Sequence, residues 1–128
     1  MGPARFTKLE LQVMEALWAG GPLAVRQVLE RFPEKRRPAY TTIQTVLYRL
    51  ETKRAVRRTR KIGNAHIFEA AMSKASTQGR LIDEVLGLLG GRAEPVMVHL
   101  IETGKLTLDD VRRAERLIEE LDRKGKGS

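Results

Sequence analysis

The 128-residue sequence predicts a mainly α-helical protein with one small β-hairpin, organised as two domains. Three observations carry this prediction. Apolar residues recur at helical spacing through most of the chain. Residues 55–70 instead alternate on both sides of a Gly-Asn turn, as the strands of a hairpin do. The charge divides the chain after Met72: residues 1–72 carry 14 Lys and Arg against 6 Asp and Glu, whereas residues 73–128 carry 10 of each.

The first helix is predicted from its ends. Thr7 and Glu10 have the spacing of a capping box, in which each side chain accepts a hydrogen bond from the other residue's backbone N–H. Leu9, Val13 and Leu17 then form an apolar row, and a Gly-Gly-Pro run ends the helix.

A second, shorter helix is expected over about Val25 to Phe32, and a third over about Tyr40 to Lys53. The residues of the third helix expected to face inward are Ile43, Val46, Leu47 and Leu50. Those expected to face outward are Tyr40, Thr41, Gln44, Thr45, Tyr48 and Arg49. Three helices followed by a hairpin describe a winged helix-turn-helix, with the third helix in the recognition position.

The hydroxyl-rich start of the third helix favours a binding role. Thr41, Thr42 and Thr45 are mediocre helix formers because their hydroxyls compete with the helical backbone. In a major groove, threonine can contact phosphates, base edges or thymine methyl groups, and a glutamine such as Gln44 can pair with adenine. The alternative is an ordinary surface helix whose hydroxyls face solvent.

The basic excess is concentrated around the same helix. Residues 35–61 contain ten Lys and Arg and the single acidic residue Glu51. A concentrated positive field attracts polyanions, among which nucleic acid is the commonest partner. The candidate phosphate-binding cations are Arg36 and Arg37 before the helix, and Arg58, Arg60 and Lys61 in the hairpin. The alternative for both groups is a charged, hydrated surface.

Several classes of protein are disfavoured. Without cysteine, neither disulfides nor thiolate metal sites can form. His66 and His99 lie in different segments and have no partner motif, and no phosphate-binding loop occurs, so we expect no enzyme, cofactor or metal site. No apolar run approaches the roughly 18–20 residues that span a bilayer. We therefore expect a cytoplasmic protein without a membrane partner.

Residues 73–128 predict a separate helical segment. Helices are expected over about Ser73 to Leu89 and Pro95 to Thr103, followed by a third helix capped by Thr107. Together they carry more apolar surface than three helices can hide, which indicates an isologous dimer. The candidate dimerisation residues are Leu86, Leu89, Val96, Met97, Leu100, Ile101, Val111, Ile118 and Leu121.

Four stretches of the sequence resemble the penicillinase-repressor family of bacterial transcription regulators (BlaI/MecI/CopY type). They are "FTKLELQVMEALW" in the first helix, "AYTTIQTVLYRLETKR" at the recognition helix, "VRRTRKIGNAHIFEA" in the wing, and "LLGGRAEPVMVHLIETGKLTLDDVRRAERLIEELD" in the C-terminal segment. The resemblance covers about residues 6 to 123. The "AYTT" stretch after a basic loop is its most specific part.

The resemblance implies a homodimeric repressor on a palindromic operator. Base reading would fall to Thr41, Thr42, Gln44, Thr45 and Tyr48, with Arg49 near the phosphates and Arg58, Arg60 and Lys61 in the wing. Tyr40 is a further DNA-binding candidate on its position alone, because its hydroxyl lies at the start of the helix and can reach the DNA backbone. Copper-responsive members end in a cysteine-rich motif that this chain lacks. In β-lactam-responsive members a protease cuts in the second C-terminal helix, so a regulatory protease is a candidate partner, acting near His99 and Leu100.

We therefore predict a DNA-binding domain over residues 1–72 and a dimerisation domain over residues 73–128, which together act as a sequence-specific transcriptional repressor. Two alternatives share the charge distribution. A nucleoid-type protein would bind DNA without a preferred site, and a winged-helix interaction module would bind an acidic protein. The operator, the regulated genes and the inducing signal, whether proteolysis or a ligand, stay open.

Overall fold

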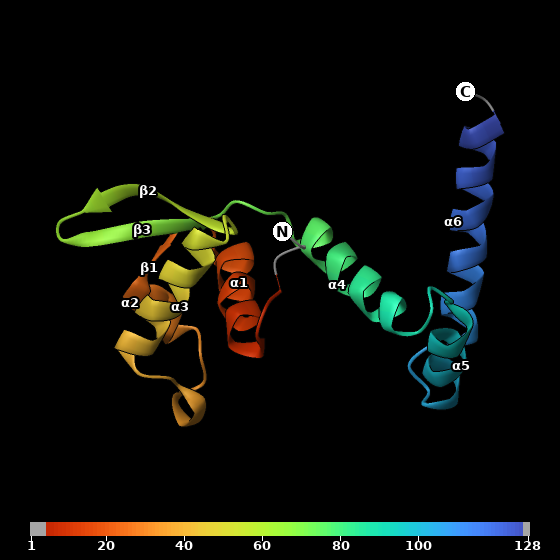
Figure 1. Cartoon of the computed structure of the whole chain (residues 1–128), viewed down its shortest axis with the longest axis horizontal. Helices are drawn as coiled ribbons and strands as arrows, with labels where there is room; N and C mark the ends of the chain where they lie inside the picture. The colour runs from red at the N-terminus through yellow and green to blue at the C-terminus, as the bar shows by residue number, and fades with distance from the viewer. Residues whose placement is uncertain (1–4, 127–128) are drawn as a thin grey trace. The chain divides into compact units, whose positions relative to one another are not determined.

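The structure, a computed structural model, describes residues 5–126 and confirms a mainly helical chain with a small β wing (Figure 1). Its α-helices are α1 (Lys8–Gly20), α2 (Val25–Glu30), α3 (Tyr40–Thr52), α4 (Lys74–Leu88), α5 (Glu94–Glu102) and α6 (Leu108–Lys126). The strands are β1 (Leu23–Ala24), β2 (Val56–Ile62) and β3 (Ala65–Ala70), and a short 3₁₀ helix, η1, covers Glu34–Arg36.

The sheet has one strand more than the predicted hairpin. β1 pairs antiparallel with β3, Leu23 opposite Phe68, so that β3 lies between β1 and β2. A two-residue strand is too short to show alternation in the sequence. The register of β2 and β3 shifts between Arg58 and Arg60, so the alternation predicted for the wing is interrupted there. Gly63 has a φ of 60°, which allows the tight turn between the two strands.

One hydrophobic core holds the three helices and the sheet together. α3 packs against both α1 and α2, and β3, between β1 and β2 in the sheet, also packs against α1 and α2. Side chains that are at most 2% exposed include Val13, Met14, Leu17, Val28, Ile43, Leu47, Leu50, Val56 and Phe68. The predicted inward face of α3 is therefore buried. Trp18, half-buried beside this core, donates from Nε1 to the Met72 carbonyl at 2.9 Å and ties the end of the sheet to α1.

An ion pair links the start of α1 to the end of α3. The predicted capping box is present: Thr7 N–H donates to Glu10 Oε1 at 2.8 Å, and Glu10 N–H to Thr7 Oγ1 at 3.1 Å. Glu10 is only 2% exposed, and Lys53 Nζ donates to both of its carboxylate oxygens, at 2.7 and 2.8 Å. Burial alone would raise the pKa of Glu10, but the bonds from Lys53 and Thr7 outweigh it and lower that pKa.

The end of α3 has an unusual residue at its cap. Arg54 N–H donates to the Glu51 carbonyl at 3.0 Å and Ala55 N–H to the Leu50 carbonyl at 2.8 Å, the two bonds of a Schellman motif. The residue between helix and strand must then be left-handed, and Arg54 has a φ of 63°. Glycine usually fills this position, because a side chain there meets steric strain.

The chain divides into two compact units, one up to Leu81 and one from Ile82. The predicted boundary after Met72 lies just before α4, and the division falls later, within that helix. The first turns of α4 belong to the first unit: Thr77 is fully buried, and Lys74 Nζ lies 3.3 Å from Glu15 Oε2. Among residues 5–126, no helix is both long enough and apolar enough to span a membrane.

In the second unit, α5 is apolar and α6 is strongly amphipathic. α6 begins with the predicted cap, in which Asp110 N–H donates to Thr107 Oγ1 at 3.2 Å and Thr107 N–H to Asp110 Oδ2 at 2.9 Å. These bonds, with one from Arg113, lower the pKa of Asp110. Gly104, with a φ of 76°, ends the turn after α5.

Candidate nucleic-acid interface

The outward face of α3 is the centre of the candidate interface. Consecutive residues of an α-helix are about 100° apart, so the row Thr41, Thr45 and Tyr48 lies opposite the buried face. All three of these residues are exposed, Tyr48 by 40%, and Gln44 lies half-buried beside them. The helix therefore presents a polar row on one side while its other side is fixed in the core.

The threonine hydroxyls are not equivalent. Thr45 Oγ1 donates to the Thr41 carbonyl at 3.0 Å, so its hydroxyl proton is used within the helix although the residue is exposed. Thr42 lines a groove of about 300 Å³ together with Leu9, Thr41, Thr45, Val46 and Arg49. All three candidate threonines therefore border one groove.

Tyr48 joins α3 to the wing. Its hydroxyl accepts a hydrogen bond from Gln44 Nε2 at 3.0 Å, and its ring centroid lies 6.5 Å from that of the buried Phe68. Arg58 of β2 lies over the Tyr48 ring, with Cζ 4.9 Å from the centroid, and Arg58 Nε donates to Glu51 Oε2 at 2.9 Å. A cation over an aromatic ring at a partly exposed site contributes about 1 kcal/mol.

The predicted phosphate-binding cations fall into two groups. In the first, the guanidinium is already engaged: Arg58 as above, and Arg37 through hydrogen bonds to the Phe32 and Glu30 carbonyls at 3.0 and 3.2 Å. Arg37 thereby covers the carbonyl end of α2, where cations are favourable. Within residues 5–126, the second group has no ion-pair or hydrogen-bond partner for its side chains; it consists of Arg36, Arg49, Arg60 and Lys61.

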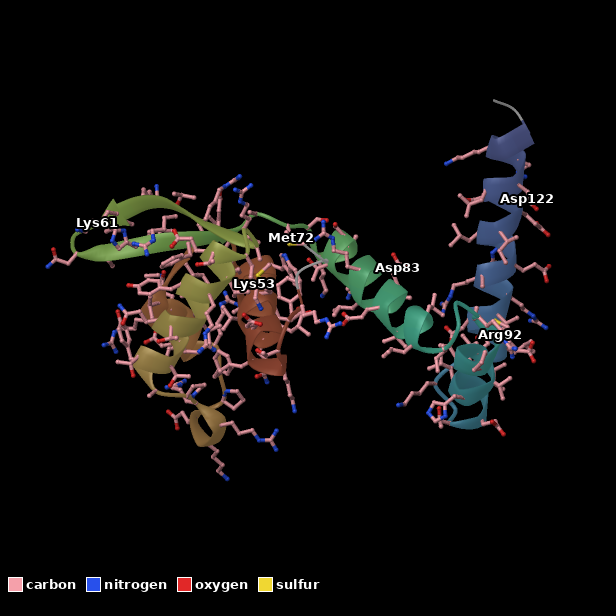
Figure 2. The ribbon with its side chains drawn as sticks, viewed as in Figure 1. Lys53, Lys61, Met72, Asp83, Arg92 and Asp122 are labelled. Atoms are coloured by element: carbon pink, nitrogen blue, oxygen red, sulfur yellow. The ribbon has the colours of Figure 1, made fainter. Side chains whose placement is uncertain are left out.

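Lys61 lies near the tip of the wing (Figure 2). The exposed cations of β2 are therefore carried away from the core on a two-stranded extension. Such an extension can reach a groove or a phosphate strand beside the one that a recognition helix occupies. Lys53, labelled in the same view, lies where α3 ends and is engaged by Glu10 instead.

A cavity of about 380 Å³ opens between α2, α3 and the wing. It is lined by Ala24, Val25, Arg26, Gln27, Glu30, Tyr40, Gln44, Tyr48, Asn64, Ala65, His66 and Phe68. Arg26, which the sequence did not single out, has its Cζ 5.7 Å from the Tyr40 ring centroid. Only the approach of α2 to the start of α3 reveals this pair, since no spacing rule connects the two residues.

The arrangement offers binding groups and no assembled metal site. Among the residues that the structure describes, no group of three His, Cys, Asp or Glu side chains is placed to hold a metal ion. What the surface offers is a polar helix face, unpaired cations on both sides of it, and a basic wing. These features are suited to binding a nucleic acid, whose phosphates carry the charge and whose base edges carry the sequence.

The candidate dimerisation residues all lie in the second unit, which begins within α4. Leu86, Val96 and Leu100 are half-buried. The others are exposed by 41–60%: Leu89, Met97, Ile101, Val111, Ile118 and Leu121. Apolar side chains of this size on consecutive helices form a surface that one chain leaves uncovered.

Comparison with known proteins identifies the family. The model of the penicillinase repressor family matches residues 6–120. The transcriptional regulator BlaI of Mycobacterium tuberculosis, from strains CDC 1551 and H37Rv, is 34% identical over 114 residues, which cover 86% of this chain and 82% of BlaI. A crystal structure of a MarR mutant from Escherichia coli matches with a TM-score of 0.50 at 14% identity, covering 91% of this chain and 77% of MarR.

The MarR similarity, at 14% identity, concerns the fold alone and agrees with a winged helix. The family match and the identity to BlaI confirm the resemblance seen in the sequence, and they place the chain among transcriptional regulators and not among enzymes. The protein belongs to the penicillinase repressor family, as a transcriptional regulator with a winged-helix DNA-binding fold.

Proposed function

We propose that the protein is a homodimeric repressor that binds a palindromic operator in duplex DNA and thereby blocks transcription. The observation that carries the proposal is the outward row of α3, Thr41, Thr45 and Tyr48 with Gln44 beside it, on a helix whose opposite face is buried. Such a row can read base edges in a major groove while flanking cations bind phosphates.

The unpaired cations are suited to the phosphate-binding part of this proposal. Arg36 precedes α3, Arg49 lies on its flank, and Arg60 and Lys61 lie in the wing, so phosphates could be bound on either side of the reading helix. Contacts of this kind supply affinity without sequence information and make binding depend on salt. The side chains proposed to read sequence, in contrast, are of polar, uncharged types: Thr41, Gln44, Thr45 and Tyr48.

The second unit supports the dimeric part of the proposal. Val111, Ile118 and Leu121 lie along α6 at i, i+7 and i+10, the spacing of a helix seam. They are 41–60% exposed in the single chain, and a second copy is the simplest cover for them. Two copies related by a twofold axis would bring two α3 helices to successive major grooves.

Release from the operator by proteolysis is a further part of the proposal. A protease acting near His99 and Leu100 would cut within α5, which runs from Glu94 to Glu102. A helix must unwind locally before a protease can bind it in an extended form. Cleavage there would separate the apolar residues of α5 from one another and so weaken the dimer.

The test is selection of bound fragments from a random duplex library at about 0.15 M salt, with sedimentation velocity on the same preparation. We expect a dimer and an enriched inverted repeat whose half-site centres are about 10–10.5 base pairs, or a multiple of this, apart. Binding without enrichment would instead indicate a nucleoid-type protein. Negligible affinity for all duplexes would favour the protein-interaction alternative.

A further inference from the structure

Arg58 is a wing residue whose guanidinium is directed at the recognition helix. Its Nε donates to Glu51 Oε2 at 2.9 Å, and its Cζ lies 4.9 Å from the Tyr48 ring centroid and 5.3 Å from that of Phe68. The side chain of Arg58 is 34% exposed, against 66% for its neighbour Arg57. An arginine held by a carboxylate and two rings is poorly placed to reach for a phosphate.

The contacts of Arg58 continue to a candidate base-reading residue. Tyr48, between the guanidinium and the helix, accepts a hydrogen bond from Gln44 Nε2 at 3.0 Å. This bond uses one of the two amide protons of Gln44 and orients the amide. The Oε1 acceptor and the other N–H remain, and these are the two groups with which glutamine pairs with N6 and N7 of adenine.

We propose that Arg58 is a positioning residue, which acts through Tyr48 to fix the amide of Gln44 and so sets the preference for an A·T pair at one operator position. The inference rests on the proposed function and concerns how its recognition helix reads sequence. Glu51, the single acidic residue between positions 35 and 61, has the role of holding Arg58 in place. An amide fixed before binding rejects the wrong base more strongly, because less freedom is lost on correct pairing.

The first experiment compares Arg58→Lys with Arg60→Ala on the selected operator and on the operator changed at the base pair that Gln44 reads. That base pair is the one at which Gln44→Ala relaxes discrimination. Lysine keeps the charge but lacks the planar fork. We expect Arg58→Lys to lower the affinity ratio by about 5–50-fold with an unchanged salt slope. Arg60→Ala should keep the ratio and flatten the salt slope by about 0.9.

A second measurement tests the coupling. Once Gln44 is alanine, Arg58→Lys should lower the affinity ratio no further, whereas two independent contacts would give additive losses. Glu51→Gln should release Arg58, which we expect to raise affinity for random DNA, steepen the salt slope and lower the affinity ratio together. Additive losses, or a Glu51→Gln variant with an unchanged ratio, would overturn the inference.

The Tyr48→Phe variant tests whether a fall in the affinity ratio comes from lost positioning or from misfolding. It keeps the ring against Arg58 and Phe68 and removes only the hydroxyl that accepts from Gln44. We expect the same fall in the affinity ratio with wild-type thermal unfolding, and an unchanged ratio would refute the proposed chain of contacts. A wild-type protein that selects no site would end the proposed function itself. A selective wild type whose Arg58→Lys variant keeps the ratio would end only this inference.

Discussion

The two compact units of the chain differ in how far they bury their apolar side chains. In the unit up to Leu81, every side chain of the core cluster lies within the unit, and Phe68 and Met14 are fully buried. In the unit from Ile82 on, none of the described hydrophobic residues is buried, and Leu88 is 83% exposed. The first unit is therefore a folded domain by itself. The second leaves an apolar surface uncovered, which a second copy would cover under the proposed function.

The largest effect is expected from a charge placed on the apolar surface of the second unit. Ile118→Asp puts a carboxylate on the α6 seam, where Ile118 is 60% exposed in one chain but would be enclosed in a dimer. We expect a monomer and an operator affinity lower by about 10²–10⁴-fold, since the second half-site no longer adds avidity. Sedimentation velocity and DNA-binding anisotropy measure both. Lys124→Gln, with the same change of charge, is the control, and a persistently dimeric Ile118→Asp protein would contradict the proposal.

Truncating a core side chain of the first unit tests whether its stability is independent of assembly. Leu47→Ala removes a fully buried side chain of α3, and we expect it to lower the free energy of unfolding by about 2–5 kcal/mol at every protein concentration. Its matched variant is Leu121→Ala, at a position 59% exposed. The loss for Leu121→Ala should depend on protein concentration, as expected for a dimer contact. Urea unfolding at two concentrations separates the two cases, and identical behaviour would show that the units do not differ.

The ion pair of the first unit predicts a dependence on pH. Because the folded state lowers the pKa of Glu10, its ionised form stabilises folding at pH values above the ordinary glutamate pKa of about 4.3. That stability is lost as pH falls through the lower pKa of the folded state. Glu10→Gln keeps the capping acceptor but not the charge, and should cost about 1–3 kcal/mol at neutral pH.

The difference between wild type and Glu10→Gln should then shrink as the pH falls below about 4.3, measured by urea unfolding across the acid range. Glu15→Gln is the control, because the Glu15 side chain is 53% exposed and its ion pair with Lys74 is a surface pair. A constant difference at all pH values would mean that the charge on Glu10 contributes nothing.

The smallest expected effect is a gain in stability. Arg54→Gly places glycine at the left-handed residue after α3 and should raise the free energy of unfolding by about 0.5–1 kcal/mol. Arg54→Ala removes the same charge but keeps the steric strain, so it should bring no gain. The corresponding turn after α5 already has a glycine, Gly104, so the second unit offers no such gain there. Equal stability of the two Arg54 variants would argue against strain at this residue.

Much of the fold followed from periodicity and end signals in the sequence. The capping boxes at Thr7 and Thr107 and the inward face of α3 all occur as predicted, because each depends on residues within a few positions of one another. β1 was missed for the opposite reason: a two-residue strand is defined only by its pairing with β3, far along the chain. Local patterns determine the helices, and long-range pairing determines the third strand.

The candidate site was predictable in its position but not in its internal bonds. Composition and charge pointed to α3 and the wing, yet they could not separate the individual cations of the loop, such as Arg37, or of the wing, such as Arg58 and Arg60. Arg37 instead bonds to the carbonyls ending α2 and Arg58 to Glu51, whereas Arg60, like Arg36, Arg49 and Lys61, is without a side-chain partner in the described part of the chain. Which cation meets which carboxylate depends on how the hairpin folds back over the helix, and no spacing in the sequence encodes that distance.

The position of β2 in the sheet has one more consequence. With β3 in the middle, the outer edge of β2 has no neighbouring strand among residues 5–126, and an open edge can pair with another chain and start aggregation. Arg57 and Arg58 on this strand are paired with Glu69 and Glu51, but Arg60 and Lys61 have no ion-pair partner in the described part of the chain. Repulsion between these unpaired charges opposes the pairing of two such edges. The unpaired wing cations therefore oppose self-association through this edge when the protein is not bound to DNA. Alanine substitutions made there to study binding should be accompanied by a measurement of self-association.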